Sequence, residues 1–251
     1  MFLGDQMSTP TSLPNSNSHD LLTITDSQRT TLIVIGCYIV AILVLWNLPV
    51  LKLILYPFKL ITVAFHEFSH ALAGVCTGAT ILAIKVDPDE GGVTLMRGGA
   101  QCFTLPAGYL GSSLIGALMI FTGFNILASK VMTIFIALSL LACLYWAKNW
   151  LLRGLTVLFI AIIVLLWVFG KGDIMRYVVL FMGVMSCCYS LWDIVEDLVF
   201  RKVNESDATK FARLWCCCPA QVCGFLWFII SLIFLSVGVL AGIVVFKDPG
   251  A

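Results

Sequence analysis

Charged side chains are scarce in this 251-residue chain: only 12% of its residues are Asp, Glu, Lys or Arg, whereas 60% are hydrophobic. The mean hydropathy is correspondingly high, at +1.01. A surface that faces water needs far more charge than this, so the composition excludes a soluble globular protein. Most of the surface must face hydrocarbon, which predicts a multi-pass integral membrane protein surrounded by the lipid bilayer.

The chain also lacks a cluster of basic residues and a secretory signal. Its formal net charge is +1, and its lysines and arginines are scattered, whereas nucleic-acid binding needs a clustered basic face. Nucleic acid is therefore excluded as a partner. Residues 1–31 are rich in Ser, Thr, Asn and Pro, and the first long apolar run starts near Leu32. We expect residues 1–28 to form a disordered polar tail and residues 29–251 to form one integral-membrane domain.

Apolar runs of about 20 residues, the length that a helix needs to cross the bilayer, recur along the chain. They predict an all-α fold, a polytopic membrane bundle of about six to seven spans. A polar, Gly-rich segment at 78–104 interrupts this pattern, and its Asp/Pro/Gly cluster predicts a small β-hairpin. Pro57 and Pro106 are expected to open the helices that follow them, and residues 200–220 are expected to form a loop. The runs are 32–55, 58–75, 107–127, 131–146, 151–169, 175–199 and 222–246.

Two of the three histidines stand in one short motif, His66-Glu67-Phe68-Ser69-His70. On a helix, this four-residue spacing brings both imidazoles to one face, where they can share a Zn²⁺ ion. Glu67 lies beside the pair, and its carboxylate can take a proton from zinc-bound water and hand it to a leaving amine. The expectation for a chance match in this composition is roughly 6 in 10,000. The spacing therefore predicts hydrolytic zinc chemistry.

A simpler interpretation is that His66 and His70 are ordinary polar residues of an interfacial helix and that Glu67 is solvated. The apolar residues on both sides of the motif argue against it, because unpaired polar groups are costly inside a membrane.

Further motifs, in order along the chain, resemble the M50B-like branch of the site-2-protease group of intramembrane zinc metallopeptidases. They are residues 65–71, Gly91-Gly92, residues 106–113 and Ser206-Asp207-Ala208, and the resemblance spans roughly residues 55–235. It implies an integral-membrane zinc endopeptidase that cuts membrane-anchored substrates within or near the bilayer. It also implies that a β-hairpin after the HExxH helix lines the active site.

A catalytic zinc ion needs a third protein ligand, and the sequence offers no third clustered histidine. Better-studied site-2 proteases use an aspartate within a Pro-x-x-Asp-Gly signature, whereas no aspartate of this chain is followed by glycine. Asp193 is the first candidate, because a carboxylate deep in an apolar run is costly unless it meets a metal or a cation. Asp207 is the second, through its resemblance to the Ser-Asp-Ala element of the branch. Asp197, one turn after Asp193, is a third, and the 193–197 cluster can also be a helix end at the interface beside Arg201 and Lys202.

The leading functional interpretation is an intramembrane zinc metalloprotease, a hydrolase. One alternative is a non-catalytic membrane protein of the same fold that binds or escorts membrane clients, and another is a transporter with Glu67 and Asp193 as a proton relay. The complete His-Glu-His set favours the enzyme, and no inverted repeat supports a transporter.

Two groups of small residues have simpler assignments. Gly108, Gly111 and Gly116 have the spacing of residues that let helices approach closely, so they are assigned to packing. Three cysteines at an expected membrane edge are candidates for S-acylation or for interfacial filling: Cys216, Cys217 and Cys218.

Overall fold

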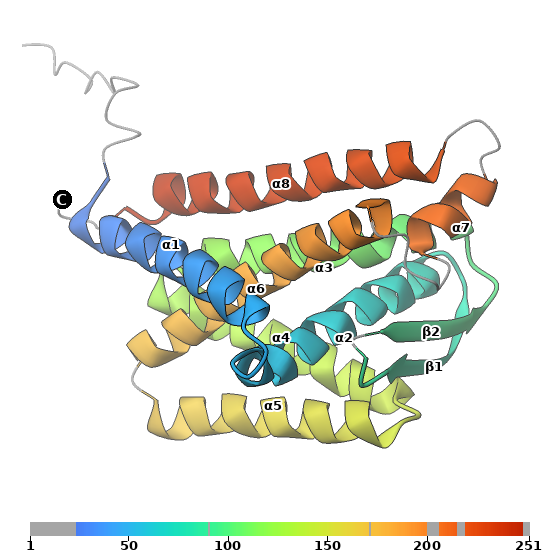
Figure 1. Ribbon diagram of the computed structural model, residues 1–251. Coiled ribbons are helices and arrows are strands. Elements are labelled where there is room, and N and C mark those ends of the chain that lie inside the picture. Colours follow the sequence, from blue (N-terminus) through green and yellow to red (C-terminus); the bar gives the residue numbers. More distant parts are fainter. Residues whose placement is uncertain (1–23, 90, 171, 200–205, 215–218, 248–251) are drawn as a thin grey trace, which may run out of the picture.

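The computed structural model describes residues 24–89, 91–170, 172–199, 206–214 and 219–247 (Figure 1). Eight helices and one two-stranded sheet make up this described part of the chain. In chain order the elements are α1 (Asp26–Asn47), α2 (Lys52–Cys76), β1 (Thr80–Val86), β2 (Gly92–Arg97), α3 (Gln101–Thr122), α4 (Ile126–Trp146), α5 (Trp150–Phe169), α6 (Gly172–Val199), α7 (Asp207–Leu214) and α8 (Ala220–Val245).

Six of the described helices, α1, α3, α4, α5, α6 and α8, are long and apolar enough to cross a membrane. The chain is therefore a multi-pass integral membrane protein, and the predicted helical bundle is confirmed. The histidine motif lies on α2, which is not one of these six helices.

Helices α3 and α6 form the centre of the bundle. Half or more of the apolar stretch of each is buried (50% and 61%), against at most 28% in the other four spans. In Figure 1, α8 runs along one side of this pair and α5 along the other. A β-carbon on Gly116 would lie 2.9 Å from the carbonyl oxygen of Gly183, and the Ser112 and Ser190 hydroxyls are 2.8 Å apart. The packing role predicted for Gly116 is therefore confirmed.

Helix α1 begins at Asp26, inside the predicted tail, because Thr25 caps it. The backbone N–H of Gln28 donates to the Thr25 hydroxyl (3.3 Å), and the backbone N–H of Thr25 donates to the Gln28 side chain (3.1 Å). The last three residues of the predicted 1–28 tail are thus helical, and residues 1–23 lie outside the described part. At its other end α1 stops at Asn47, ahead of Pro49.

Two prolines lie inside helices, although the sequence predicted that each would open one. Helix α2 begins at Lys52, five residues before Pro57, and α3 begins at Gln101, five residues before Pro106. In the second turn of a helix, the missing N–H of proline removes one backbone hydrogen bond close to the helix end. The predicted helix starts are therefore wrong by about five residues at each helix.

The predicted β-hairpin forms beside α2 (Figure 1). Its strands pair antiparallel, Thr80–Val86 against Gly92–Arg97. Gly78, with φ of +82°, turns the chain between the end of α2 and β1. On the other side of β1, Ile84 forms a parallel bridge with Ala147 of the α4–α5 connection. The hairpin is thus held between the bundle and the histidine helix.

Helix α7 lies within residues 200–220, which the sequence predicted to be a loop. Ser206 caps its first turn by accepting a backbone hydrogen bond of 3.2 Å from the residue three positions later. Ala208 is buried in a cluster with Tyr109 of α3 and Trp227 of α8, and the ring of Phe211 lies edge-on to Trp227. These contacts fix α7 against α3 and α8.

Candidate active site

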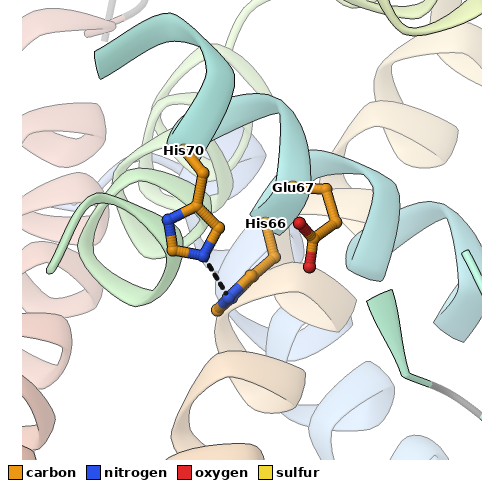
Figure 2. A group of neighbouring side chains, drawn as sticks. All are labelled: His66, Glu67 and His70. Atoms are coloured by element: carbon orange, nitrogen blue, oxygen red, sulfur yellow. Dashed lines mark hydrogen bonds between the residues drawn. The ribbon is translucent and has the colours of Figure 1, made fainter. Parts of the chain in front are cut away.

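The two histidines project from one face of α2 and point toward each other (Figure 2). Both are buried, and their Nε2 atoms lie 3.0 Å apart. Nδ1 of His70 donates a hydrogen bond of 2.6 Å to the carbonyl oxygen of Thr104, in the first turn of α3. Because a carbonyl can only accept, Nδ1 carries a proton, so Nε2 is the atom of His70 that a metal would bind.

The carboxylate of Asp207, the first residue of α7, lies against both imidazoles. Its Oδ2 atom is 3.1 Å from Nε2 of His66 and 3.0 Å from Nε2 of His70. Burial raises the pKa of the Asp207 carboxyl, but His70 and His66 outweigh burial and hold this pKa well below its usual range. Three ligand-type atoms from two distant segments therefore meet at one point.

The structure thus places the second-ranked aspartate, Asp207, beside the histidines and not the first-ranked Asp193. Asp193 is half-buried near the end of α6, whereas its neighbour Ile194 is buried toward α7. Because adjacent helical residues differ by about 100° in direction, Asp193 does not share the side of α6 on which Ile194 faces α7. The side chain of Asp197 lies outside the described residues.

Glu67 is buried next to the histidines, and the hairpin holds its side chain. The hydroxyl of Thr94 on β2 lies 2.7 Å from Oε2 of Glu67 and 2.8 Å from its carbonyl oxygen. A β-carbon on Gly92 would lie 2.6 Å from Oε1, so only glycine lets β2 come this close. Ligand-type atoms of His66, Glu67 and His70 lie within 4.8 Å of one another. The carboxylate is therefore one water molecule away from the histidine nitrogens.

Helix α3 lies close to the histidine face of α2 at two of its glycines. A β-carbon on Gly108 would lie 2.4 Å from Nε2 of both His66 and His70, and one on Gly111 would lie 2.5 Å from Cβ of Ser69. Gly108 therefore belongs to the site, which the packing assignment made from the sequence missed. The ring of Tyr109 lies edge-on to His66, with centroids 4.7 Å apart.

The donor set fits a zinc ion. Two imidazole nitrogens and one carboxylate oxygen are a common ligand set of catalytic zinc, which keeps a fourth position for water or substrate. Ligands at the usual zinc distances and tetrahedral angles lie about 3.3 Å apart, close to the 3.0 and 3.1 Å found here. Gly108 keeps the backbone of α3 clear of this point, as a metal between the nitrogens would require.

A cavity of about 330 Å³ opens beside this cluster. Glu67, His70 and Asp207 line it together with β2, the start of α3 and Lys210 of α7. The ammonium of Lys210 lies 3.9 Å from Oδ1 of Asp207, the oxygen that faces away from the histidines. A peptide in this cavity would reach the carboxylate of Glu67 and the ligand-type atoms together.

Sequence reasoning missed three parts of this site: Thr94, Gly108 and the carbonyl of Thr104. A backbone carbonyl leaves no trace in a sequence, and threonine in a strand has many ordinary roles. Gly108 lies in the 106–113 motif that carried the family resemblance, which was the available signal.

Residues 35–238 match the Peptidase M50B-like family, a range that includes α2, the hairpin and α7. A comparison with curated proteins gave no significant match, and neither did a comparison with solved structures. Because the match covers most of the chain, this membrane protein belongs to the peptidase M50B-like family.

Proposed function

We propose that this chain is a zinc metalloprotease that hydrolyses peptide bonds of membrane-anchored proteins within or near the bilayer. The observation that carries the proposal is the meeting of His66, His70 and Asp207 at one point, with Glu67 beside them. A structural ion pair needs neither a glycine facing both imidazoles nor a buried glutamate next to them.

In this proposal, His66, His70 and Asp207 hold the zinc ion. The carbonyl of Thr104 keeps the His70 ring in the tautomer that presents Nε2, and Lys210 faces the remaining oxygen of Asp207. When bound, zinc supplies Lewis acidity that polarises a carbonyl group and makes water acidic near neutral pH.

Glu67 is the general base and then the general acid. Its carboxylate takes the proton from the attacking water and delivers it to the nitrogen of the departing amine. The Thr94 hydroxyl engages Oε2, which leaves Oε1 for the proton. Both strands of the hairpin therefore contribute to the reaction. Strand β2 carries Thr94, and β1 pairs with β2 and holds it in place.

The position of the site suits a substrate that arrives from the membrane. Helix α2 lies within a bundle of spanning helices, and the hairpin beside it lines the cavity, as irregular backbone at membrane depth requires. A substrate helix must unwind there, since its backbone carbonyls are hydrogen-bonded within the helix.

The test compares cells that produce wild-type protein with cells that produce Glu67→Gln. This variant keeps the size of the side chain and removes the base, so it should retain zinc and lose cleavage by about 10²–10⁴-fold. Membrane proteomics should show single-span proteins whose soluble fragments disappear. Glu196→Gln on α6, outside the site, is the matched control and should cleave normally. If Glu67→Gln restores every phenotype of a deletion strain, the chain acts as a client-binding scaffold.

A further inference from the structure

A second cavity, of about 450 Å³, lies among α1, α2, α4, α5 and α6, apart from the histidine site. Its lining is almost wholly apolar. Ile61 and Phe65 of α2 form the inner wall, and Phe65 directly precedes the first histidine of the motif. Leu166 of α5 and Ile174 of α6 also line it, and Ile174 is exposed.

Water does not suit this cavity. A buried water needs two to four polar partners, and the Thr133 and Tyr38 hydroxyls at this cavity already have partners. The Thr133 hydroxyl donates to the carbonyl of Lys130 (2.7 Å) and accepts from Trp167 Nε1 (3.0 Å), and the Tyr38 hydroxyl donates to the carbonyl of Tyr177 (3.4 Å). An apolar cavity of about 150 Å³ is already large enough to exclude water and bind a small apolar ligand. A cavity of about 450 Å³ leaves many wall atoms without packing contacts unless an apolar group fills it.

The cavity communicates with the hydrocarbon of the membrane. Helix α5 packs mainly on α4 and touches α6 little, and it lies at the outer side of the bundle in Figure 1. At this α5–α6 opening Ile174 is 52% exposed and Leu166 is half-buried. Both α5 and α6 are membrane spans, so the opening faces lipid.

We propose that this cavity binds one acyl chain of a bilayer phospholipid, which enters between α5 and α6. The acyl chain is the apolar group that a bilayer supplies in excess, and its flexibility suits a cavity walled by Phe58, Phe159 and Phe181. These rings pack edge to face, with centroids 5.6 and 5.1 Å apart, so the walls are irregular. The bound chain packs against half-buried Phe58 of α2 and Phe181 of α6 and so supports α2 on the side away from the histidines. This inference is independent of the proposed protease activity.

Native mass spectrometry of detergent-purified protein tests the proposal with two tryptophan variants. Val178→Trp places a large side chain in the cavity, because half-buried Val178 lines it. Val164→Trp is the control, since Val164 on α5 is 54% exposed and lies outside the lining. Wild type and Val164→Trp should each retain one phospholipid per chain, and Val178→Trp should retain none. Equal retention by both variants, or no retained lipid in wild type, overturns the proposal.

A labelling experiment on the unaltered chain covers the case in which Val178→Trp fails to fold. Wild-type protein is reconstituted with a phosphatidylcholine that carries a photoactivatable group on one acyl chain, and it is then washed in detergent and irradiated. Cross-links should appear at Phe58, Val178 and Phe181, which line the cavity and are half-buried. Cross-links confined to exposed residues overturn the site. A retained molecule with the mass of a sterol or a free fatty acid overturns the phospholipid assignment.

Discussion

Gly108 of α3 lies so close to His70 of α2 that a β-carbon at position 108 would stand 2.4 Å from Nε2 of the ring. The same β-carbon would lie 2.4 Å from Nε2 of His66. Any side chain at position 108 would therefore have to displace the two rings. The space in front of both ring nitrogens is set by α3, although both rings belong to α2.

Replacing Gly108 with alanine should weaken zinc binding more than it weakens the fold. The added methyl group would occupy the position of the metal, and displacing the rings would misalign both ligands. We expect at least the 10–100-fold loss of affinity that is typical of changes around a metal site. Zinc titration of the purified variant measures it. Gly36→Ala on α1, where a β-carbon meets nothing within 4 Å, is the control and should bind zinc normally. Wild-type affinity in Gly108→Ala would show that no metal lies between the rings.

One zinc ion should bind per chain, and the double variant His66→Ala, His70→Ala should bind none. Two of three ligands are lost, and a lone carboxylate does not hold zinc against water. Elemental analysis of wild-type and variant protein gives the stoichiometry. An unchanged zinc content in the double variant would place the metal elsewhere.

Asp207→Asn should lower zinc occupancy far more than Asp193→Asn does. The amide is a weak zinc ligand, and Asp207 is the aspartate within 3.1 Å of both histidines. Asp193→Asn is the matched control, because it makes the same chemical change on a spanning helix outside the cluster. The reverse ranking of the two zinc contents would return the third ligand to Asp193.

Thr94→Val should keep zinc and reduce cleavage. The substitution keeps the shape of the side chain but removes the hydroxyl that lies 2.7 Å from Oε2 of Glu67, so the base is less well oriented. We expect a loss of about 10–100-fold in turnover, as for other residues that orient catalytic groups. Cleavage of a substrate identified with Glu67→Gln measures it. Thr94→Ser, which restores a hydroxyl, should recover most of the activity; failure to recover would assign Thr94 a packing role.

The sequence by itself determined the features that depend on neighbours along the chain. Scarce charge and apolar runs of helical length gave a membrane bundle, since a spanning segment must satisfy its backbone internally and face lipid with apolar side chains. The Asp/Pro/Gly cluster predicted the hairpin, because these residue types favour a turn between neighbouring strands. The spacing of His66 and His70 gave one shared helix face, because an α-helix returns to the same side every 3.6 residues.

Tertiary structure decided what completes the site. Asp207 lies 141 residues from His66, and it reaches the imidazoles because Ser206 caps α7 and Ala208 packs between α3 and α8. The burial inferred from the sequence favoured Asp193 as the third ligand. The direction in which the Asp193 side chain points, however, depends on which helices α6 packs against. Gly108 likewise showed its role only when α3 was seen against α2. Contacts between distant segments follow from the packing of whole helices, which a pattern of neighbouring residues does not encode.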